Sequence, residues 1–335
     1  MHISYEEELA LVKGILVAAD FPEEDAGLIA KVITHSDFTG VYSHGLSRLT
    51  RYMRQIKEGS LNPRPNFRKV LDTGAVMVFD SDNGSGIASV CKAYDQCLER
   101  AREFGIAMAT GRHNANIGCG SYYGWRAAAD DMVAIVCCNT YAWTSPFGGA
   151  DRLIGTNPIV IGVPAGQEYP MVLDMSTTNV AMGKIQAAER EKQPIPAEWA
   201  KDYDGNPTTD PNKAVYFTPA GGPKGYGLGV VVDMLTGILS GGQFGPHVTG
   251  MYTEMEKKRD LAHFVMVVDP ARFEGGKTFK SRLTEMVNEI HQIPPAEGFK
   301  SVLAPGEPEY LKQEARKVDG VMLEDYIWDD IINLS

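Results

Sequence analysis

The fold of this chain depends on the interpretation of one glycine-rich stretch, GRHNANIGCGSYYG, residues 111–124. An apolar run at residues 104–110 precedes it, and a helix-like segment at residues 125–131 follows it. Strand, glycine loop and helix in this order are typical of a turn that binds the pyrophosphate of a dinucleotide at a helix N-terminus. The first question is therefore whether residues 111–124 form such a turn.

The residues that follow do not fit a dinucleotide turn. Such a turn requires an acidic residue at the end of the next strand, where it binds the ribose. The next apolar run, residues 132–140, ends in Asn139 and Thr140 instead. Aromatic and polar side chains also crowd the turn itself. The sequence therefore favours an α/β fold that is not of the Rossmann type.

Length and charge restrict the classes of function. The chain has 335 residues, of which 44% are hydrophobic and 22% charged, enough for a full core and for two or three lobes. Its formal net charge of −11 argues against a nucleic-acid groove or an anionic membrane surface, since both call for clustered Lys and Arg. It has neither a signal-peptide pattern nor a membrane-length apolar run. We expect a cytoplasmic protein with a small-molecule function and no nucleic-acid or membrane partner.

The cysteines give no sign of a disulfide framework or a metal site. Their number is odd, and no pair has the spacing of a zinc knuckle. Cys137 and Cys138 are adjacent in an apolar run, where cysteine usually acts as a small buried hydrophobic residue. No His or carboxylate pair has ligand spacing either, so we expect no bound metal.

The first part of the chain is expected to be helical. Ser4 and Glu7 form a capping box at the start of one helix, and Pro22 opens a second helix that runs toward Phe38. A third amphipathic helix is expected at residues 46–58.

After residue 66 the pattern changes to interleaved strands and helices. Strands are expected at residues 70–72, 75–79, 105–110, 132–139, 158–163 and 263–268. Helices are expected at residues 88–104, 122–131, 226–241 and 277–291. Residues 192–223 are rich in Pro, Asp, Gly and Asn and are expected to form a long functional loop. From Gly298 the tail is expected to be loop-rich as far as residue 325, with residues 325–332 ordered again.

One candidate for chemistry lies between the second and third helices. His44 stands between Ser43 and Gly45, and Arg48 follows one helical turn later. An isolated His is most often a satisfied core residue. With Arg48 nearby, His44 can instead exchange a proton with a substrate oxygen, while the guanidinium holds a carboxylate through two parallel hydrogen bonds. Spacing alone leaves both interpretations open.

Two further segments have the composition of anion or hydroxyl sites. Lys224 lies in a glycine-rich turn before an apolar helix, where backbone N–H groups favour anions. The alternative is a flexible turn with a solvated Lys. Asp174 is followed by hydroxyl residues at the end of a strand, just before an expected helix; the alternative there is simple N-capping.

Taken together and in this order, the segments resemble the type 2 malate/L-lactate dehydrogenase family of NAD(P)-dependent oxidoreductases, which is unrelated in fold to the Rossmann-type lactate and malate dehydrogenases. The resemblance covers nearly the whole chain. It rests on residues 40–45 (GVYSHG), 146–149 (PFGG), 155–158 (GTNP), 174–178 (DMSTT), 222–227 (GPKGYG) and 305–306 (PG). Within the family, residues 195–199 and 205–211 look most like the branch of ureidoglycolate dehydrogenases.

The resemblance implies an answer to the opening question. In this family the loop at residues 111–124 belongs to the substrate side of the active site. The family usually has its proton-transferring His where this chain has Asn116, and His113 lies three residues earlier as the reserve candidate. Asn can orient an oxygen but does not accept a proton at useful pH.

The resemblance also implies the remaining site residues. It places His44 in catalysis and Ser43, Arg48 and Tyr52 at the substrate. It assigns to NAD, with NADP not excluded, the residues Thr140, Asp174, Met175, Ser176, Lys224, Gly306, Glu307 and Pro308. It further implies a homodimer with the active site near the subunit interface.

The implied architecture has two parts. Residues 74–308 would form a cofactor domain on a mainly antiparallel or mixed sheet, with the loop excursion near residues 192–223. Residues 1–73 and 309–335 would form a helical domain on the substrate side, made from both chain ends.

The function implied is the NAD(H)-dependent interconversion of a small 2-hydroxy carboxylate, such as a ureidoglycolate-, malate- or lactate-like acid, and its 2-oxo acid. One alternative is the reduction of a cyclic imine carboxylate, a chemistry also found in this family, for which Asn116 would be tolerable. The other is a cofactor-binding protein that has lost catalysis.

Overall fold

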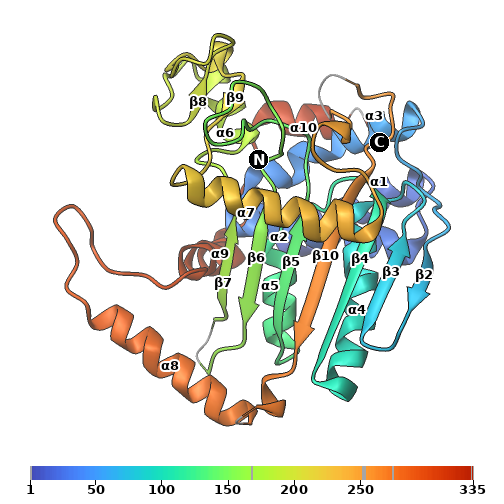
Figure 1. The fold of residues 1–335 in the computed structure, drawn as a ribbon, viewed down its shortest axis with the longest axis vertical. Helices are drawn as coiled ribbons and strands as arrows, with labels where there is room; N and C mark the ends of the chain where they lie inside the picture. The colour runs from blue at the N-terminus through green and yellow to red at the C-terminus, as the bar shows by residue number, and fades with distance from the viewer. Residues whose placement is uncertain (1, 167–168, 251–253, 274, 333, 335) are drawn as a thin grey trace.

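A computed structural model of the chain describes residues 2–166, 169–250, 254–273, 275–332 and 334. Its centre is a seven-stranded sheet with the strand order β2-β3-β4-β10-β5-β6-β7 (Figure 1). The strands are β2 (Arg68–Asp72), β3 (Val76–Asp80), β4 (Ile106–Asn114), β5 (Val133–Cys138), β6 (Ile159–Val163), β7 (Met171–Met175) and β10 (Leu261–Val268). Only β3 and β4 are parallel; the other neighbours in this sheet are antiparallel. The prediction of an α/β fold on a mixed sheet is confirmed.

The strand order also excludes a Rossmann unit around the glycine loop. Helix α5 (Ser121–Ala129) connects β4 to β5, but β10 lies between these two strands and is antiparallel to both. A dinucleotide-binding unit places two parallel strands next to each other on either side of its first helix.

Helices cover both faces of the sheet, as Figure 1 shows. Helix α4 (Gly86–Phe104) and α5 pack on one face, and α7 (Pro223–Asp233) crosses the other. Alternate strand residues that face α4 and α5, such as Ala109, Val136 and Val265, are at most 1% exposed. These residues share one core cluster with Ile33 and other residues of the N-terminal helices. The sheet and the first helices are therefore packed as one continuous hydrophobic unit.

The two chain ends meet beside this core. The short strand β1 (His2–Ile3) pairs with β11 (Val321–Met322). Helices α1 (Tyr5–Ala18), α2 (Glu23–Thr39) and α3 (Leu49–Lys57) begin the chain, and α9 (Glu307–Asp319) and α10 (Asp325–Ile332) end it. Helix α2 contacts α9, and α3 contacts α10.

The expectation of a loop-rich tail between Gly298 and residue 325 was wrong for α9. This helix begins directly after Gly306, with Pro308 in its first turn, where proline needs no amide donor. Glycine and proline are typical of loops, but here they mark the start of a helix. Its acidic first turn and basic last turn match the helix dipole.

The excursion at residues 192–223 is largely irregular, with a two-stranded ladder of β8 (Ala200–Lys201) and β9 (Tyr216–Phe217). Helix α6 (Met182–Arg190) precedes it, and α8 (Gly276–Gln292) follows β10. All five cysteines are buried and unpaired, including Cys137 and Cys138, for which burial was expected. Among the described residues, no helix has both the length and the apolarity needed to cross a bilayer.

Candidate active site

The His44 segment is a tight turn between α2 and α3. Gly40 ends α2 in the left-handed region, with φ of 86°, where glycine carries no steric penalty. Two short 3₁₀ turns follow, Tyr42–His44 and Leu46–Arg48. Helix α6 packs directly against the first turn, because a Cβ atom on Gly183 would lie 2.7 Å from the Cβ of Ser43. The packing of α6 against Ser43 therefore restricts the conformation of this turn.

Within this turn the structure brings together Ser43, His44 and Arg48. The Ser43 hydroxyl lies 2.9 Å from Nδ1 of His44, which orients the ring and leaves Nε2 for another partner. The guanidinium of Arg48 donates from Nε to the Ser43 carbonyl oxygen. Burial, with the charge of Arg48 adding to it, lowers the pKa of His44 to about 3. His44 is therefore a neutral imidazole at physiological pH, the form that accepts a proton.

Asn116 and Tyr52 form a second pair next to this turn. The Tyr52 hydroxyl lies 3.4 Å from Oδ1 of Asn116, and the same oxygen accepts a hydrogen bond of 2.7 Å from the Gly118 amide. Tyr52 follows Arg48 by four residues, so the two side chains leave the same side of the helical segment. The contact between Tyr52 and Asn116 therefore places the loop at residues 111–124 next to the side of the helical segment that carries Arg48 and Tyr52.

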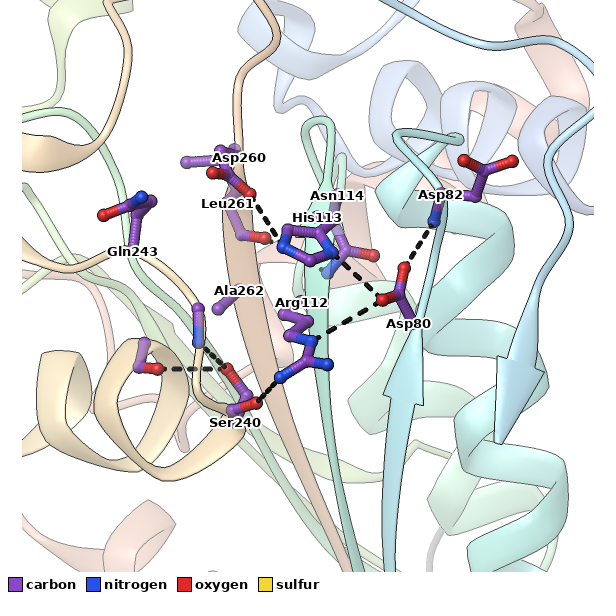
Figure 2. A network of polar contacts seen from close by, with 12 residues as sticks. Asp80, Asp82, Arg112, His113, Asn114, Ser240, Gln243, Asp260, Leu261 and Ala262 are labelled. Carbon is purple, nitrogen blue, oxygen red and sulfur yellow. Dashed lines mark hydrogen bonds and ion pairs between the residues drawn. The ribbon is translucent and has the colours of Figure 1, made fainter. Parts of the chain in front are cut away.

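His113, the reserve candidate for catalysis, is held in a different network. Figure 2 shows its ring between two carboxylates. Nδ1 lies 3.2 Å from Asp80 and Nε2 lies 3.7 Å from Asp260. Arg112 approaches the same Asp80 oxygen at 3.6 Å and donates to the carbonyl oxygen of Ser240 at 3.1 Å. Because both ring nitrogens face carboxylates of the chain, His113 is placed to link β3, β4 and the start of β10.

Hydroxyl and amide groups lie close together just after the end of β5 and just before the start of β6. The Thr140 hydroxyl lies 3.2 Å from that of Thr156 and accepts a hydrogen bond of 2.8 Å from the Thr156 amide. Asn157 accepts from the Thr140 amide and donates to the carbonyl oxygen of Gly229 in α7. We had assigned no role to Thr156 and Asn157, although both stand in the GTNP motif at residues 155–158. That motif was the sequence signal for them.

Lys224 lies in the first turn of α7. Gly222 directly precedes this helix with φ of 65°, a left-handed conformation that disfavours other residues. A Cβ atom on Gly225 would lie 2.4 Å from the carbonyl oxygen of Ala220, so the turn closes tightly on itself. Pro223 has no amide hydrogen, and the Gly225 amide donates to the Ala220 carbonyl oxygen at 2.8 Å. The Lys224 side chain is therefore the group of this turn that suits an anion.

Asp174 is the next-to-last residue of β7 and does not cap the helix that follows, which was the simple alternative. Its Oδ2 accepts a hydrogen bond of 2.6 Å from the Ser121 amide, at the N-terminus of α5. Asp174 is exposed at this edge of the sheet, and its carboxylate keeps this hydrogen bond to the Ser121 amide. The start of α5, which the glycine stretch leads into, is therefore already occupied by a carboxylate of the chain. Met175 follows in β7, and the Ser176 hydroxyl after it donates to the Thr178 carbonyl oxygen at 3.0 Å.

Residues 306–308 lie against the edge of β7. A Cβ atom on Gly306 would stand 2.9 Å from the Val172 amide nitrogen, so only glycine allows this approach. Glu307 accepts a hydrogen bond of 2.9 Å from the Ala304 amide and lies 2.8 Å from Nε2 of His291. Its carboxylate is therefore engaged within the chain. No cluster of three or more metal-ligating side chains occurs among the residues that the structure describes.

Comparisons with known proteins identify the family of the chain. Residues 3–332 match the family model of malate/L-lactate dehydrogenases. The chain belongs to this family. The L-sulfolactate dehydrogenase of Methanocaldococcus jannaschii is 37% identical over 335 residues, which cover 99% of this chain and 95% of that protein. The solved structure of a sulfolactate dehydrogenase from the same organism has a TM-score of 0.92 at 36% identity, with coverage of 100% of this chain and 96% of that one.

Two other proteins are also similar to this chain. The ureidoglycolate dehydrogenase (NAD(+)) of Escherichia coli K12 is 32% identical over 333 residues, or 99% of this chain and 95% of that protein. The structure of delta1-piperideine-2-carboxylate reductase from Pseudomonas syringae has a TM-score of 0.91 at 25% identity, with 100% of both chains covered. The resemblance inferred from the sequence motifs is therefore confirmed.

Proposed function

We propose that this protein is an NAD(H)-dependent dehydrogenase that interconverts a small 2-hydroxy carboxylate and its 2-oxo acid. The observation that carries the proposal is the turn on which Ser43 orients the His44 ring and the Arg48 guanidinium lies beside it. An imidazole for the hydroxyl proton and a guanidinium for the carboxylate are the two groups that this substrate class requires. The named dehydrogenases of the family act on acids of this class.

In this mechanism Arg48 binds the substrate carboxylate and His44 exchanges the hydroxyl proton. The low pKa of His44 keeps its ring neutral and ready to accept that proton during oxidation. A bound substrate carboxylate would raise the pKa again, because a nearby negative charge favours the imidazolium form. Asn116 orients the substrate oxygen by a hydrogen bond and leaves the proton to His44.

The residues assigned to the cofactor fit a dinucleotide. The Lys224 ammonium suits its phosphates, and the hydroxyls of Thr140 and Ser176 follow the ends of β5 and β7. When bound, a nicotinamide cofactor supplies or accepts the hydride. We propose NAD over NADP because a carboxylate such as Asp174 suits a ribose diol better than a 2′-phosphate, and one relative is named for NAD(+).

A screen of substrates tests the proposal. Oxidation of NADH and of NADPH would be followed at 340 nm with pyruvate, oxaloacetate, sulfopyruvate and a cyclic imine carboxylate. We expect turnover with a 2-oxo acid. Turnover of the imine alone would favour the reductase alternative, which Asn116 and the piperideine carboxylate reductase structure support. Binding of NADH without turnover of any substrate would favour the catalytically silent alternative.

We also propose a cytoplasmic homodimer. The five thiols are buried and unpaired, which suits a reducing compartment. The helical segment of α7 and the π-helical turn Met234–Ile238 leaves Leu228, Val231, Met234 and Ile238 between 45% and 55% exposed. A contiguous apolar surface of this kind is typical of a subunit interface. Light scattering with size-exclusion chromatography measures the mass, and a monomer at micromolar concentration would contradict the proposal.

A further inference from the structure

The strand that leads to Asn116 carries a bulge at Arg112 and His113. In the pairing of β4 with β10, these two residues stand opposite the single residue Ala262. A bulge bends its strand and changes the direction of the residues that follow. Asn116, which orients the substrate oxygen in the proposed mechanism, comes three residues after His113. The shape of the bulge therefore decides where Asn116 lies.

The backbone around the bulge is strained. His113 has φ of 55°, in the left-handed region that residues other than glycine rarely adopt. Asp82, Asn83 and Asp260, with φ of 47°, 61° and 55°, share this conformation. Figure 2 shows His113 between the segments that carry Asp82 and Asp260. Four of the eight non-glycine residues with positive φ in the described part of the chain are thus found at this one place. Such strain persists only where the surrounding structure holds it, and it is most frequent at functional sites.

The His113 ring connects the elements on either side of the bulge. Nδ1 lies 3.2 Å from a carboxylate oxygen of Asp80, at the end of β3, and Nε2 lies 3.7 Å from Asp260, directly before β10. Asp80 in turn accepts a hydrogen bond of 3.1 Å from the Asp82 amide, and its side chain is only 7% exposed. The carboxylate that faces the ring is therefore itself held in place, and the ring is placed to hold the bulge against β3 and β10.

Backbone hydrogen bonds connect the bulge to Asn116. The amide of Asn83, in the connection between β3 and α4, donates to the His113 carbonyl oxygen at 2.8 Å. Two residues later, the Ala115 amide donates to the carbonyl oxygen of Gly84 at 3.0 Å. Asn116 follows directly. A change in the position of His113 is therefore transmitted to Asn116 along a backbone that is paired with one neighbouring segment.

We propose that His113 is a positioning residue: its ring, held between Asp80 and Asp260, keeps the bulge in the shape that brings Asn116 to the substrate oxygen. The inference rests on the proposed function and on the role of Asn116 in it. A displacement of about 1 Å can cost about 100-fold in rate, so loss of the ring, with the β-ladder intact, should lower kcat for the substrate by about 10-fold. The affinity for NADH should not change.

The substitution His113→Gly separates this role from a purely structural one. Glycine adopts the left-handed backbone without strain, so the variant loses the ring while its melting temperature stays close to that of the wild type. Asp131→Gly is the matched control, because Asp131 has φ of 64°, is exposed and precedes the start of β5, at the opposite end of the sheet. We expect kcat to fall in His113→Gly and to be unchanged in Asp131→Gly. An unchanged kcat in His113→Gly would overturn the proposal.

A double-mutant cycle tests whether His113 acts through Asn116. His113→Gly should cost about 10-fold in kcat in the wild type but less than about twofold in an Asn116→Ala background, because the side chain that the ring positions is already absent there. Equal losses in the two backgrounds would overturn the proposal. If His113→Gly does not fold, His113→Asn takes its place in both measurements, since Asn tolerates the left-handed backbone and also removes the ring.

A third variant distinguishes failure of this inference from failure of the proposed function. If His44→Gln turns over like the wild type, the proposed function fails, whatever the cycle shows. If His44→Gln is inactive and the cycle shows equal losses, the proposed function stands and the positioning role of His113 is wrong. A wild-type protein that turns over no substrate of the screen would overturn both.

Discussion

Replacement of Arg48 by Lys tests the carboxylate site. The Arg48 guanidinium is oriented by its Nε hydrogen bond to the Ser43 carbonyl oxygen, which fixes the plane of the fork relative to the turn. Lys keeps the positive charge but loses this anchor and the second of two parallel hydrogen bonds to a carboxylate. A hydrogen bond to a charged group is worth about 1.5–3 kcal/mol, which corresponds to a loss of about 10- to 100-fold in kcat/KM.

The assay for Arg48→Lys is steady-state kinetics with the 2-oxo acid varied, alongside a fluorescence titration of NADH. We expect the loss to appear in the KM for the acid while the Kd for NADH stays within about twofold, because Arg48 is not assigned to the cofactor. Arg54→Lys is the control, since Arg54 lies on α3, which follows directly after Arg48, with its side chain 62% exposed and paired with Glu58. An effect confined to NADH, or an unchanged KM, would refute the assignment.

Three other changes have outcomes that follow from the structure. Lys224→Ala should weaken NADH binding in a fluorescence titration without lowering the melting temperature, and an unchanged Kd would remove Lys224 from the cofactor site. Gly45→Ala should lower both stability and turnover, because its Cβ would lie 1.9 Å from Asp37. Overpacking of this kind costs about 1–3 kcal/mol of stability. An unchanged free energy of unfolding in urea would contradict the packing described. Burial lowers the pKa of His35 to about 4 and that of His263 to about 3. As the pH falls below about 6.5, these two side chains are therefore protonated in the unfolded state before they are protonated in the folded state. The free energy of unfolding should then fall by up to about 1.4 kcal/mol per pH unit for each His. Urea unfolding at pH 7 and pH 5 measures this loss, and equal stabilities would show that these rings are not buried as neutral imidazoles.

The sequence predicted most of the elements because their signals are local. The capping box at Ser4 and the period of the apolar residues place the first helices and the strands to within a few residues of their observed bounds. Helix α9 was missed because the residues before it include several glycines and prolines and Gly320 follows it, and both residue types are typical of loops. Its burial depends on contact with α2, which is more than 260 residues earlier in the chain and leaves no local signal.

The site was predictable in a similar, partial way. The motifs around His44 and Lys224 could be recognised because glycine, proline and functional side chains are close together there. The partners of His113 could not be predicted, since Asp80 and Asp260 are 33 and 147 residues away from it in the chain. The contact of Asp37 with Gly45 was equally hidden, because a buried acid near the end of a helix looks like any polar residue before a turn.

The central claim is that His44 exchanges the substrate proton, and the most direct test compares His44→Gln with His113→Gln. Turnover of each variant with a 2-oxo acid and the Kd for NADH would be measured side by side. General acid–base catalysis is typically worth about 10²- to 10⁴-fold, so His44→Gln should lose turnover within that range and keep its NADH affinity. His113→Gln should lose much less, because its ring faces Asp80 and Asp260. A crippled His113→Gln beside a mildly affected His44→Gln would contradict the account and place the base on the loop at residues 111–124.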